Sequence, residues 1–169
     1  WIQRLDGLAT REYSIASIPE QGNVELVVRQ EKTATGLGLG SGWLTEHAVL
    51  GQTIIGKIRS NPTFHLKPTH KPLILIGNGT GIAGLVAHLA QRQQWGDQQN
   101  WLIFGERQQQ FDHLYKEQLL HWVEAGASIY VCGSLKGMAQ EVEQTLFNIL
   151  GAEQLEQLRM EGRYQRDVY

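Results

Sequence analysis

Three short apolar runs, each followed by a glycine and then by a helical pattern, constrain the fold of this chain most strongly. An apolar run of this length is typical of a strand that is buried on both faces of a parallel sheet. The alternation of strands with helices therefore predicts βαβ units with right-handed crossovers. Helices are predicted over about 82–94, 111–124 and 136–150, and the tail GRYQRDVY offers one more strand. The three runs are PLILIG (72–77), WLIFG (101–105) and SIYVCG (128–133).

The first part of the chain has a different pattern, made of short strands and turns. Strands are predicted at Arg11–Ser17, Val24–Gln30 and Gln52–Arg59, where β-branched residues or an alternating pattern occur. A glycine-rich turn, TGLGLGSGWL, lies between them at Thr35–Leu44. Prolines then mark a linker, NPTFHLKPTHKP. We therefore predict a β-rich domain over residues 1–70 and an α/β domain over residues 71–169.

Composition excludes several classes of function. The 169 residues have a net charge of −2 and no basic run, so neither nucleic acid nor an anionic membrane is an expected partner. The single cysteine, Cys132, excludes an internal disulfide and suits a reducing compartment. No histidine pair has metal-site spacing, and no hydrolase motif is present.

No apolar run approaches the ~18 residues of a membrane span. The chain begins at Trp1, without an initiator methionine or a signal peptide. We interpret it as a piece of a longer protein, or as a chain from which a segment is missing.

The strongest local signal is GNGTGIAG at Gly77–Gly84, directly after a predicted buried strand and before a helix. Glycines let the backbone approach a diphosphate, and a helix N-terminus offers unpaired N–H donors. A tight turn that needs glycine only for its geometry is the alternative. The turn at Thr35–Leu44 could hold a second phosphate through Ser41 and Thr45, or could be a flexible hairpin loop. Cys132 follows a buried strand, beside the first turn, where ligands collect; a small buried hydrophobe is its alternative.

Taken together, five motifs in order resemble the ferredoxin–NADP⁺ reductase superfamily, and within it the diflavin reductases of the sulfite reductase flavoprotein type. The resemblance runs from about Leu8 to Tyr169. It implies part of a Greek-key FAD-binding β-barrel, followed by a Rossmann-like NADP-binding α/β domain. The motifs are RxYS (11–14), GxGSGWL (38–44), GNGTGIAG (77–84), YVCGSLKGMA (130–139) and RYQRDVY (163–169).

By resemblance, the RxYS segment lines the flavin. Arg11 is expected to pair with the FAD diphosphate, Tyr13 to cover the flavin or bond its ribityl chain, and Ser14 to lie near flavin N5. The chemistry is suitable, because a guanidinium forks onto phosphate oxygens and a planar ring stacks on a planar ring. An ordinary barrel strand with Tyr13 as filler is the alternative. The other residues expected to contact FAD are Val27, Val28, Arg29, Gly38, Leu39, Gly40 and Ser41.

The resemblance places NADP(H) at the second set of residues, with Thr80 near its diphosphate and Cys132 facing the nicotinamide. Ser14 and Asp167 would complete a polar set around the hydride path, where Ser14 and Cys132 position groups and do not act as nucleophiles. Tyr169 would cover the flavin face and move aside, or serve only as a hydrophobic plug. The expected catalytic residues are Ser14, Cys132, Asp167 and Tyr169, and the expected NADP(H) residues include Gly79, Thr80, Gly81, Cys132 and Gly133.

The implied activity is hydride transfer from NADPH to FAD, followed by single-electron transfer to a separate acceptor. That acceptor could be an FMN-containing flavodoxin-like domain, a cytochrome or a haemoprotein such as sulfite reductase. A cytoplasmic location is expected, at the inner face of the membrane if the full-length protein is anchored. The alternatives are a nucleotide-binding regulatory module without turnover and a cofactor-free piece.

Two departures from the family pattern stand out. The family barrel has six strands and, in diflavin members, an inserted helical domain, so the missing strands are expected before Trp1. The chain also lacks the serine–arginine and lysine–tyrosine–glutamine segments that bind the 2′-phosphate of NADPH in the family. Arg107 and Lys136 remain as cations that could contact this phosphate, or as ordinary solvated charges.

Overall fold

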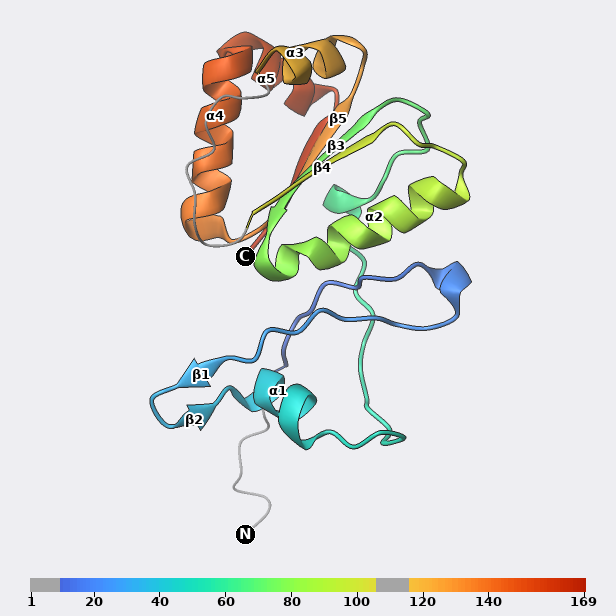
Figure 1. The fold of residues 1–169 in the computed structure, drawn as a ribbon, viewed down its shortest axis with the longest axis vertical. Helices are drawn as coiled ribbons and strands as arrows, with labels where there is room; N and C mark the ends of the chain where they lie inside the picture. The colour runs from blue at the N-terminus through green and yellow to red at the C-terminus, as the bar shows by residue number, and fades with distance from the viewer. Residues whose placement is uncertain (1–9, 106–115) are drawn as a thin grey trace.

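The computed structural model describes residues 10–105 and 116–169, and its main body is a four-stranded parallel sheet. The strands lie in the order β4-β3-β5-β6 (Figure 1). The three predicted strands and the strand in the tail are therefore confirmed, but β4 lies at the edge of the sheet and is not buried as predicted, with Leu102 and Phe104 exposed. Their bounds are β3 (Leu73–Asn78), β4 (Asn100–Gly105), β5 (Ser128–Gly133) and β6 (Tyr164–Val168).

The sheet is covered by helices on both faces, because its central strands are apolar on both. Leu73 and Leu75 of β3 belong to a core cluster with Leu85 of the helix α2 (Ile82–Gln94). Ile74 and Ile76 point to the opposite face, into the cluster that the other helices cover. Those helices are α3 (Lys116–Glu124), α4 (Gln140–Leu150) and α5 (Ala152–Met160) (Figure 1).

Helix boundaries follow the local glycines. Helix α2 has the predicted range and ends before Gly96, whose φ of 80° is a left-handed conformation that glycine adopts at low cost. Helix α4 begins later than predicted, because Lys136 and Gly137 have non-helical dihedrals within the π-helical turn η6 (Leu135–Ala139). Helix α3 agrees with the prediction where it is described; residues 106–115 lie outside the described residues. Helix α5 was not predicted.

The first part of the chain differs from the prediction. Arg11–Ser17 and Val24–Gln30 do not form regular strands. They are joined by an isolated antiparallel bridge between Ile15 and Leu26 and by the Glu25 N–H, which donates to Ser17 Oγ at 3.0 Å. The turn at Thr35–Leu44 is largely structured: it contains a strand of a short hairpin and a helix. These elements are β1 (Lys32–Thr33), β2 (Gly36–Leu37), α1 (Leu39–Gly42) and the π-helical turn η3 (Trp43–His47).

The predicted strand at Gln52–Arg59 is wrong, since this segment has no regular structure. Strands are stable only when their backbone groups pair with a neighbour, and no strand pairs with this segment in the described chain. Its apolar side chains are consequently exposed, Ile55 by 97%. A small antiparallel hairpin and a parallel α/β sheet are what the described residues show, and the expected barrel is not confirmed.

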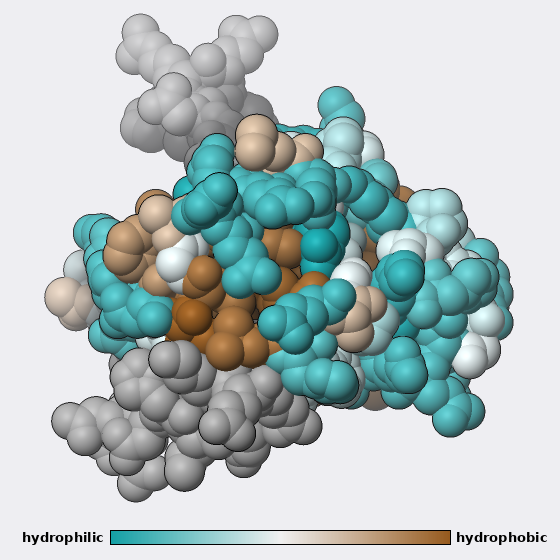
Figure 2. All heavy atoms as spheres, turned by 90° about the horizontal axis from the view of Figure 1, so that it is seen from above, coloured by the Kyte–Doolittle hydropathy of each residue, from teal (hydrophilic) through white to brown (hydrophobic). Residues whose placement is uncertain are grey.

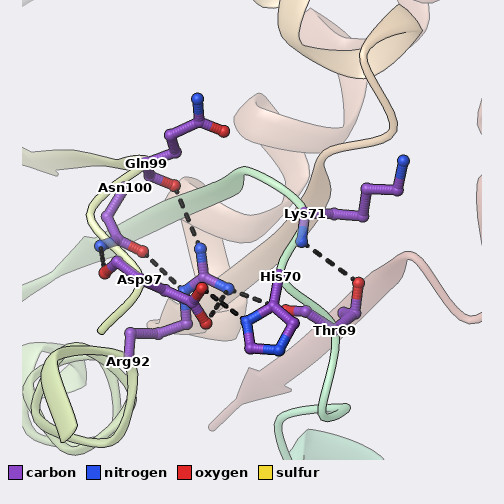
Figure 3. A network of polar contacts seen from close by, with 7 residues as sticks. All are labelled: Thr69, His70, Lys71, Arg92, Asp97, Gln99 and Asn100. Atoms are coloured by element: carbon purple, nitrogen blue, oxygen red, sulfur yellow. Dashed lines mark hydrogen bonds and ion pairs between the residues drawn. The ribbon is translucent and has the colours of Figure 1, made fainter. Parts of the chain in front are cut away.

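The linker is fixed to the α/β unit at two places. Phe64 of the turn η4 (Pro62–Phe64) packs into the same core cluster as Leu85. Further along, Arg92 of α2 is only 2% exposed and donates from Nη1 to the carbonyl oxygen of Thr69 at 2.9 Å and to Asp97 at 3.0 Å (Figure 3). Its other contacts are with Asn100 Oδ1 at 2.9 Å and the Gln99 carbonyl at 3.4 Å.

The surface at the end of the α/β unit that carries α3 and α5 is mainly polar. Figure 2 shows this face, with apolar side chains gathered in one central area between polar ones. None of the helices in the described ranges has the length and the hydropathy that crossing a membrane requires.

Candidate functional site

One group of the predicted site residues, which includes Thr80, Cys132 and Asp167, lies at or just after the carboxyl ends of β3, β5 and β6. Ligands of open α/β sheets bind at this edge, because the loops and helix N-termini that follow the strands gather there. The C-terminus of the chain lies at this edge too, on the side that faces the β-rich part (Figure 1). The candidate site is therefore the seam between the two parts.

Asp167 joins three segments of the chain at this seam. Cys132 and Asp167 are register partners on β5 and β6, which brings their side chains to the same face of the sheet. Cys132 Sγ lies 3.8 Å from Asp167 Oδ2, and Ser14 Oγ lies 3.5 Å from the same oxygen, at the long end of hydrogen bonding. Asn61 Nδ2 donates to the other carboxylate oxygen at 3.1 Å. The structure therefore brings together the three polar residues expected around the hydride path.

Burial determines the protonation state of Cys132. Burial, with smaller contributions from the charge of Asp167 and from their hydrogen bond, raises the pKa of the Cys132 thiol to about 12. The thiol is therefore protonated at neutral pH and donates to the carboxylate. A protonated buried thiol is a weak nucleophile, so this geometry agrees with a positioning role for Cys132.

The turn after β3 has the form of a phosphate-binding turn. It is a 3-10 turn, η5 (Gly79–Gly81), that leads directly into α2, and no side chain of the described residues caps either N-terminus. Gly79 has a φ of 51°, and a β-carbon at Gly81 would clash with the backbone of Cys132. The geometry of the turn alone thus explains why Gly79 and Gly81 are glycines. The turn nevertheless presents uncapped N–H groups at the start of a 13-residue helix.

Two residues that are expected at the flavin, Tyr169 and Arg29, lie against this turn. The hydroxyls of Tyr169 and Thr80 are 2.9 Å apart. The Arg29 guanidinium lies against Gly79, since a β-carbon built there would stand 3.1 Å from Arg29 Nη2. Burial raises the pKa of Tyr169, whereas the bond to Thr80 and the charge of Arg29 act in the opposite direction.

A second cluster forms where α1 begins. A β-carbon at Gly40 would lie 2.8 Å from Arg11 Cγ and 3.0 Å from the Tyr13 hydroxyl, so both side chains lie over the first turn of α1. No side chain caps this helix at Gly38. The hydroxyl of Ser41 accepts a hydrogen bond from the Glu31 backbone N–H at 3.0 Å, which fixes the hairpin to α1. Arg11, Tyr13 and the glycine-rich helix start are thus brought together.

The remaining predicted residues have fewer contacts with the candidate site. The bridge at Leu26 sets the segment of Val27 and Val28 beside that of Ser14, and their flavin contact stays a prediction. Leu39 and Lys136 are exposed. Gly133 lies against Asn78, whose Oδ1 accepts from the Ser134 N–H at 3.0 Å. Arg107 lies outside the described residues.

Sequence reasoning missed Asn61 and Asn78. Asn61 lies in the proline-rich linker, and no motif distinguishes it from a turn residue. Asn78 is the second residue of the motif GNGTGIAG, so its position was visible, but its bond to the loop after β5 depends on how the two strand ends meet.

Comparison with known proteins gives a consistent result. Residues 75–128 match the family model described as an oxidoreductase NAD-binding domain. The sulfite reductase [NADPH] flavoprotein alpha-component of Mannheimia succiniciproducens is 32% identical over 217 residues, which cover 96% of this chain and 36% of that protein. The protein of the same name from Neisseria meningitidis serogroup B is 32% identical over 224 residues, covering 100% and 37%. That of Sodalis glossinidius is 34% identical over 217 residues, covering 96% and 36%.

This chain spans little more than a third of the length of these relatives. The aligned stretches are also longer than the 169 residues of the chain, so the relatives carry segments that this chain lacks. This chain is similar to the C-terminal part of the sulfite reductase flavoprotein alpha-component, and its residues 75–128 match an oxidoreductase NAD-binding domain.

Proposed function

We propose that this chain is the FAD- and NADP-binding part of an NADPH-dependent flavoprotein oxidoreductase. The observation that carries the proposal is the meeting of Ser14, Cys132 and Asp167 at the strand ends, where the Gly79–Gly81 turn packs against Cys132. The relatives, named as NADPH-dependent sulfite reductase flavoproteins, support it. Residues 1–70 would contribute to the FAD-binding domain and residues 71–169 would form the NADP-binding domain.

The residues fit two dinucleotides. The uncapped turn at Gly79–Gly81 suits a diphosphate, because its N–H groups and the helix dipole favour an anion. The start of α1 suits a second diphosphate, since Arg11 lies over an uncapped helix start and can pair with phosphate oxygens.

When bound, FAD would supply the redox chemistry: it accepts a hydride from NADPH and passes electrons one at a time to a separate acceptor. Arg11 and Thr80 would hold the two diphosphates, and Ser14 would lie near flavin N5, with its hydroxyl hydrogen directed to Asp167. Cys132, kept protonated, would position the nicotinamide, while Asp167 would hold both side chains in place. The ring of Tyr169 would exclude water from the site.

The electron acceptor would be an FMN-containing flavodoxin-like domain or a haemoprotein. The purified chain, incubated with FAD and dialysed, should retain an absorbance band near 450 nm, and NADPH should bleach it under anaerobic conditions. Retention of the band without bleaching would favour a regulatory module, and loss of the band on dialysis would contradict FAD binding.

Arg11 provides a residue-level test of the FAD site. Arg11→Ala should weaken FAD binding about 10- to 100-fold, because hydrogen bonds to charged groups contribute roughly 1.5–3 kcal/mol. Arg159→Ala, which removes an exposed arginine of α5 that pairs with Glu156, is the matched control and should retain FAD like the unmodified chain.

A further inference from the structure

The contact between Thr80 and Tyr169 joins the start of α2 to the last residue of the chain. Thr80 lies in the middle of the uncapped turn η5, and its Oγ1 is 2.9 Å from the Tyr169 hydroxyl. The Tyr169 side chain, although 58% exposed, is therefore held against the turn that would receive a diphosphate.

The main chain of Tyr169 is fixed, so only its side chain is able to move. The Tyr169 N–H donates to the Gly133 carbonyl at 3.0 Å, and its carbonyl accepts from the Leu135 N–H at 2.8 Å. These bonds extend the pairing of β6 with β5 to the end of the chain. A change in the position of the ring thus requires only a rotation of the side chain and the loss of one hydroxyl contact.

The same turn attracts anions from two directions. The start of α2 carries a partial positive charge, and the Arg29 guanidinium lies against Gly79. Either hydroxyl can donate in the bond between Thr80 and Tyr169. When Thr80 donates its single hydrogen to Tyr169, that hydrogen is not available to a phosphate at the turn. Charged acceptors form stronger hydrogen bonds than a neutral phenol does.

We propose that Thr80 is a latch that exchanges partners: it holds the Tyr169 hydroxyl until a diphosphate binds the turn, and it then releases the ring. This inference rests on the proposed function and adds a coupling to it. The diphosphate end of the nucleotide frees the side chain that covers the place of the nicotinamide. Thr80 and the Tyr169 hydroxyl are positioning groups in this arrangement, and Arg29 draws the anion to the turn.

The test uses Tyr169→Phe, which removes the hydroxyl and keeps the ring. Dissociation constants are measured by calorimetry for NADP⁺ and for 2′-phospho-ADP-ribose, which has the diphosphate but no nicotinamide. Both ligands should bind about 2- to 10-fold more tightly to Tyr169→Phe, because neither has to break the bond to Thr80. Tyr164→Phe, at the opposite end of β6, is the control and should leave both constants unchanged.

A second variant isolates the bond itself. Thr80→Val should weaken the binding of both ligands. Adding Tyr169→Phe to this variant should not change the dissociation constants further, because the bond between the two hydroxyls is already absent. The latch is overturned if Tyr169→Phe tightens NADP⁺ but not 2′-phospho-ADP-ribose, since the hydroxyl would then act only through the nicotinamide. It is also overturned if the gain persists in the Thr80→Val background, or if Tyr169→Phe leaves both ligands unchanged or weakens them.

The proposed function fails in a different way. If the unmodified chain binds neither ligand, nucleotide binding at the turn is contradicted and the latch with it. If the unmodified chain binds both ligands and Tyr169→Phe changes nothing, the latch alone is wrong.

Discussion

Cys132 and Asp167 are register partners on two adjacent parallel strands, with Cys132 Sγ 3.8 Å from Asp167 Oδ2. The same carboxylate oxygen lies 3.5 Å from Ser14 Oγ, although Ser14 and Asp167 are 153 positions apart in the sequence. One carboxylate thus connects the β-rich part to the ends of β5 and β6, and the first two predictions below depend on this arrangement.

Replacing Asp167 by Asn should slow reduction of bound flavin by NADPH about 10- to 100-fold, because the shared acceptor of Ser14 and Cys132 loses its charge and its geometry. FAD retention should not change, since Arg11 and the start of α1 lie elsewhere. Anaerobic stopped-flow absorbance measures the rate, with the exposed Glu153→Gln as control. An unchanged rate in Asp167→Asn would contradict the positioning role.

The raised pKa of Cys132 predicts a thiol that resists alkylation. A shift from 9.0 to about 12 lowers the thiolate population at pH 8 by about a thousand-fold, and the thiolate is the reactive form. Because Cys132 is the single cysteine, mass spectrometry after iodoacetamide treatment reports on it alone. The folded chain should react far more slowly than the urea-unfolded chain, and equal rates would show that the thiol is accessible and ionised.

His88 predicts a loss of stability in acid. Its ring stacks on Phe64 at a centroid distance of 4.8 Å, its Nε2 is buried without a partner among the described residues, and burial lowers its pKa to about 4. Because the unfolded chain binds a proton at His88 more tightly than the folded chain does, protonation favours unfolding. The free energy of unfolding is therefore unaffected by His88 above about pH 6.5 and falls as the pH is lowered toward 4. The full contribution is about 3 kcal/mol.

The variant His88→Phe keeps an aromatic ring and removes the ionisable group. Its free energy of unfolding in urea should fall less between pH 6.5 and pH 4 than that of the unmodified chain. The exposed His47→Gln should retain the original pH dependence, and an equal fall in His88→Phe would assign the acid sensitivity to other groups.

Replacing the buried Arg92 should lower the free energy of unfolding substantially. Arg92→Met leaves Asp97, which is 10% exposed, without its buried partner, and breaking a buried pair from one side typically costs about 3–5 kcal/mol. Arg59→Met breaks an exposed pair with Glu12 and should cost less than about 1 kcal/mol. Urea unfolding at pH 7 measures both, and similar small values would indicate that the network in Figure 3 contributes little.

Lys136 provides a test of whether the 2′-phosphate of NADP⁺ is recognised. It is an exposed cation in the turn after β5. If it binds the 2′-phosphate, Lys136→Ala should weaken NADP⁺ about 10-fold and leave NAD⁺ unchanged, because only NADP⁺ carries that group. Lys71→Ala, at the opposite end of β3, is the control. Equal affinities of the unmodified chain for the two nucleotides would assign Lys136 to the solvated surface.

The α/β part was predictable because its signals are local. The wholly apolar run of β3 could pack only in the middle of a covered sheet, and Gly96 ends α2 where the helical pattern ends. Helix α5 was also visible in principle, since Leu155 and Leu158 have helical spacing and are buried, but Gly151 and the polar residues around them obscured it. The start of α4 depended on the conformation of Gly137.

The β-rich part was less predictable because a strand depends on its neighbours. Gln52–Arg59 has a strand-like pattern, yet no strand pairs with it in the described chain. The site itself was predicted by resemblance, but its contacts were not. The bond of Tyr169 to Thr80 and the position of Arg29 against Gly79 depend on how the two parts meet.

The most direct test of the account is a crystal structure of the chain with FAD and NADP⁺ bound. One diphosphate is expected over Gly79–Gly81 and the other beside Arg11 at the start of α1, with the flavin and nicotinamide rings stacked next to Ser14 and Cys132. Diphosphates bound at other places, or a seam still occupied by the side chains of Tyr169 and Arg29 with no space for two rings, would contradict it.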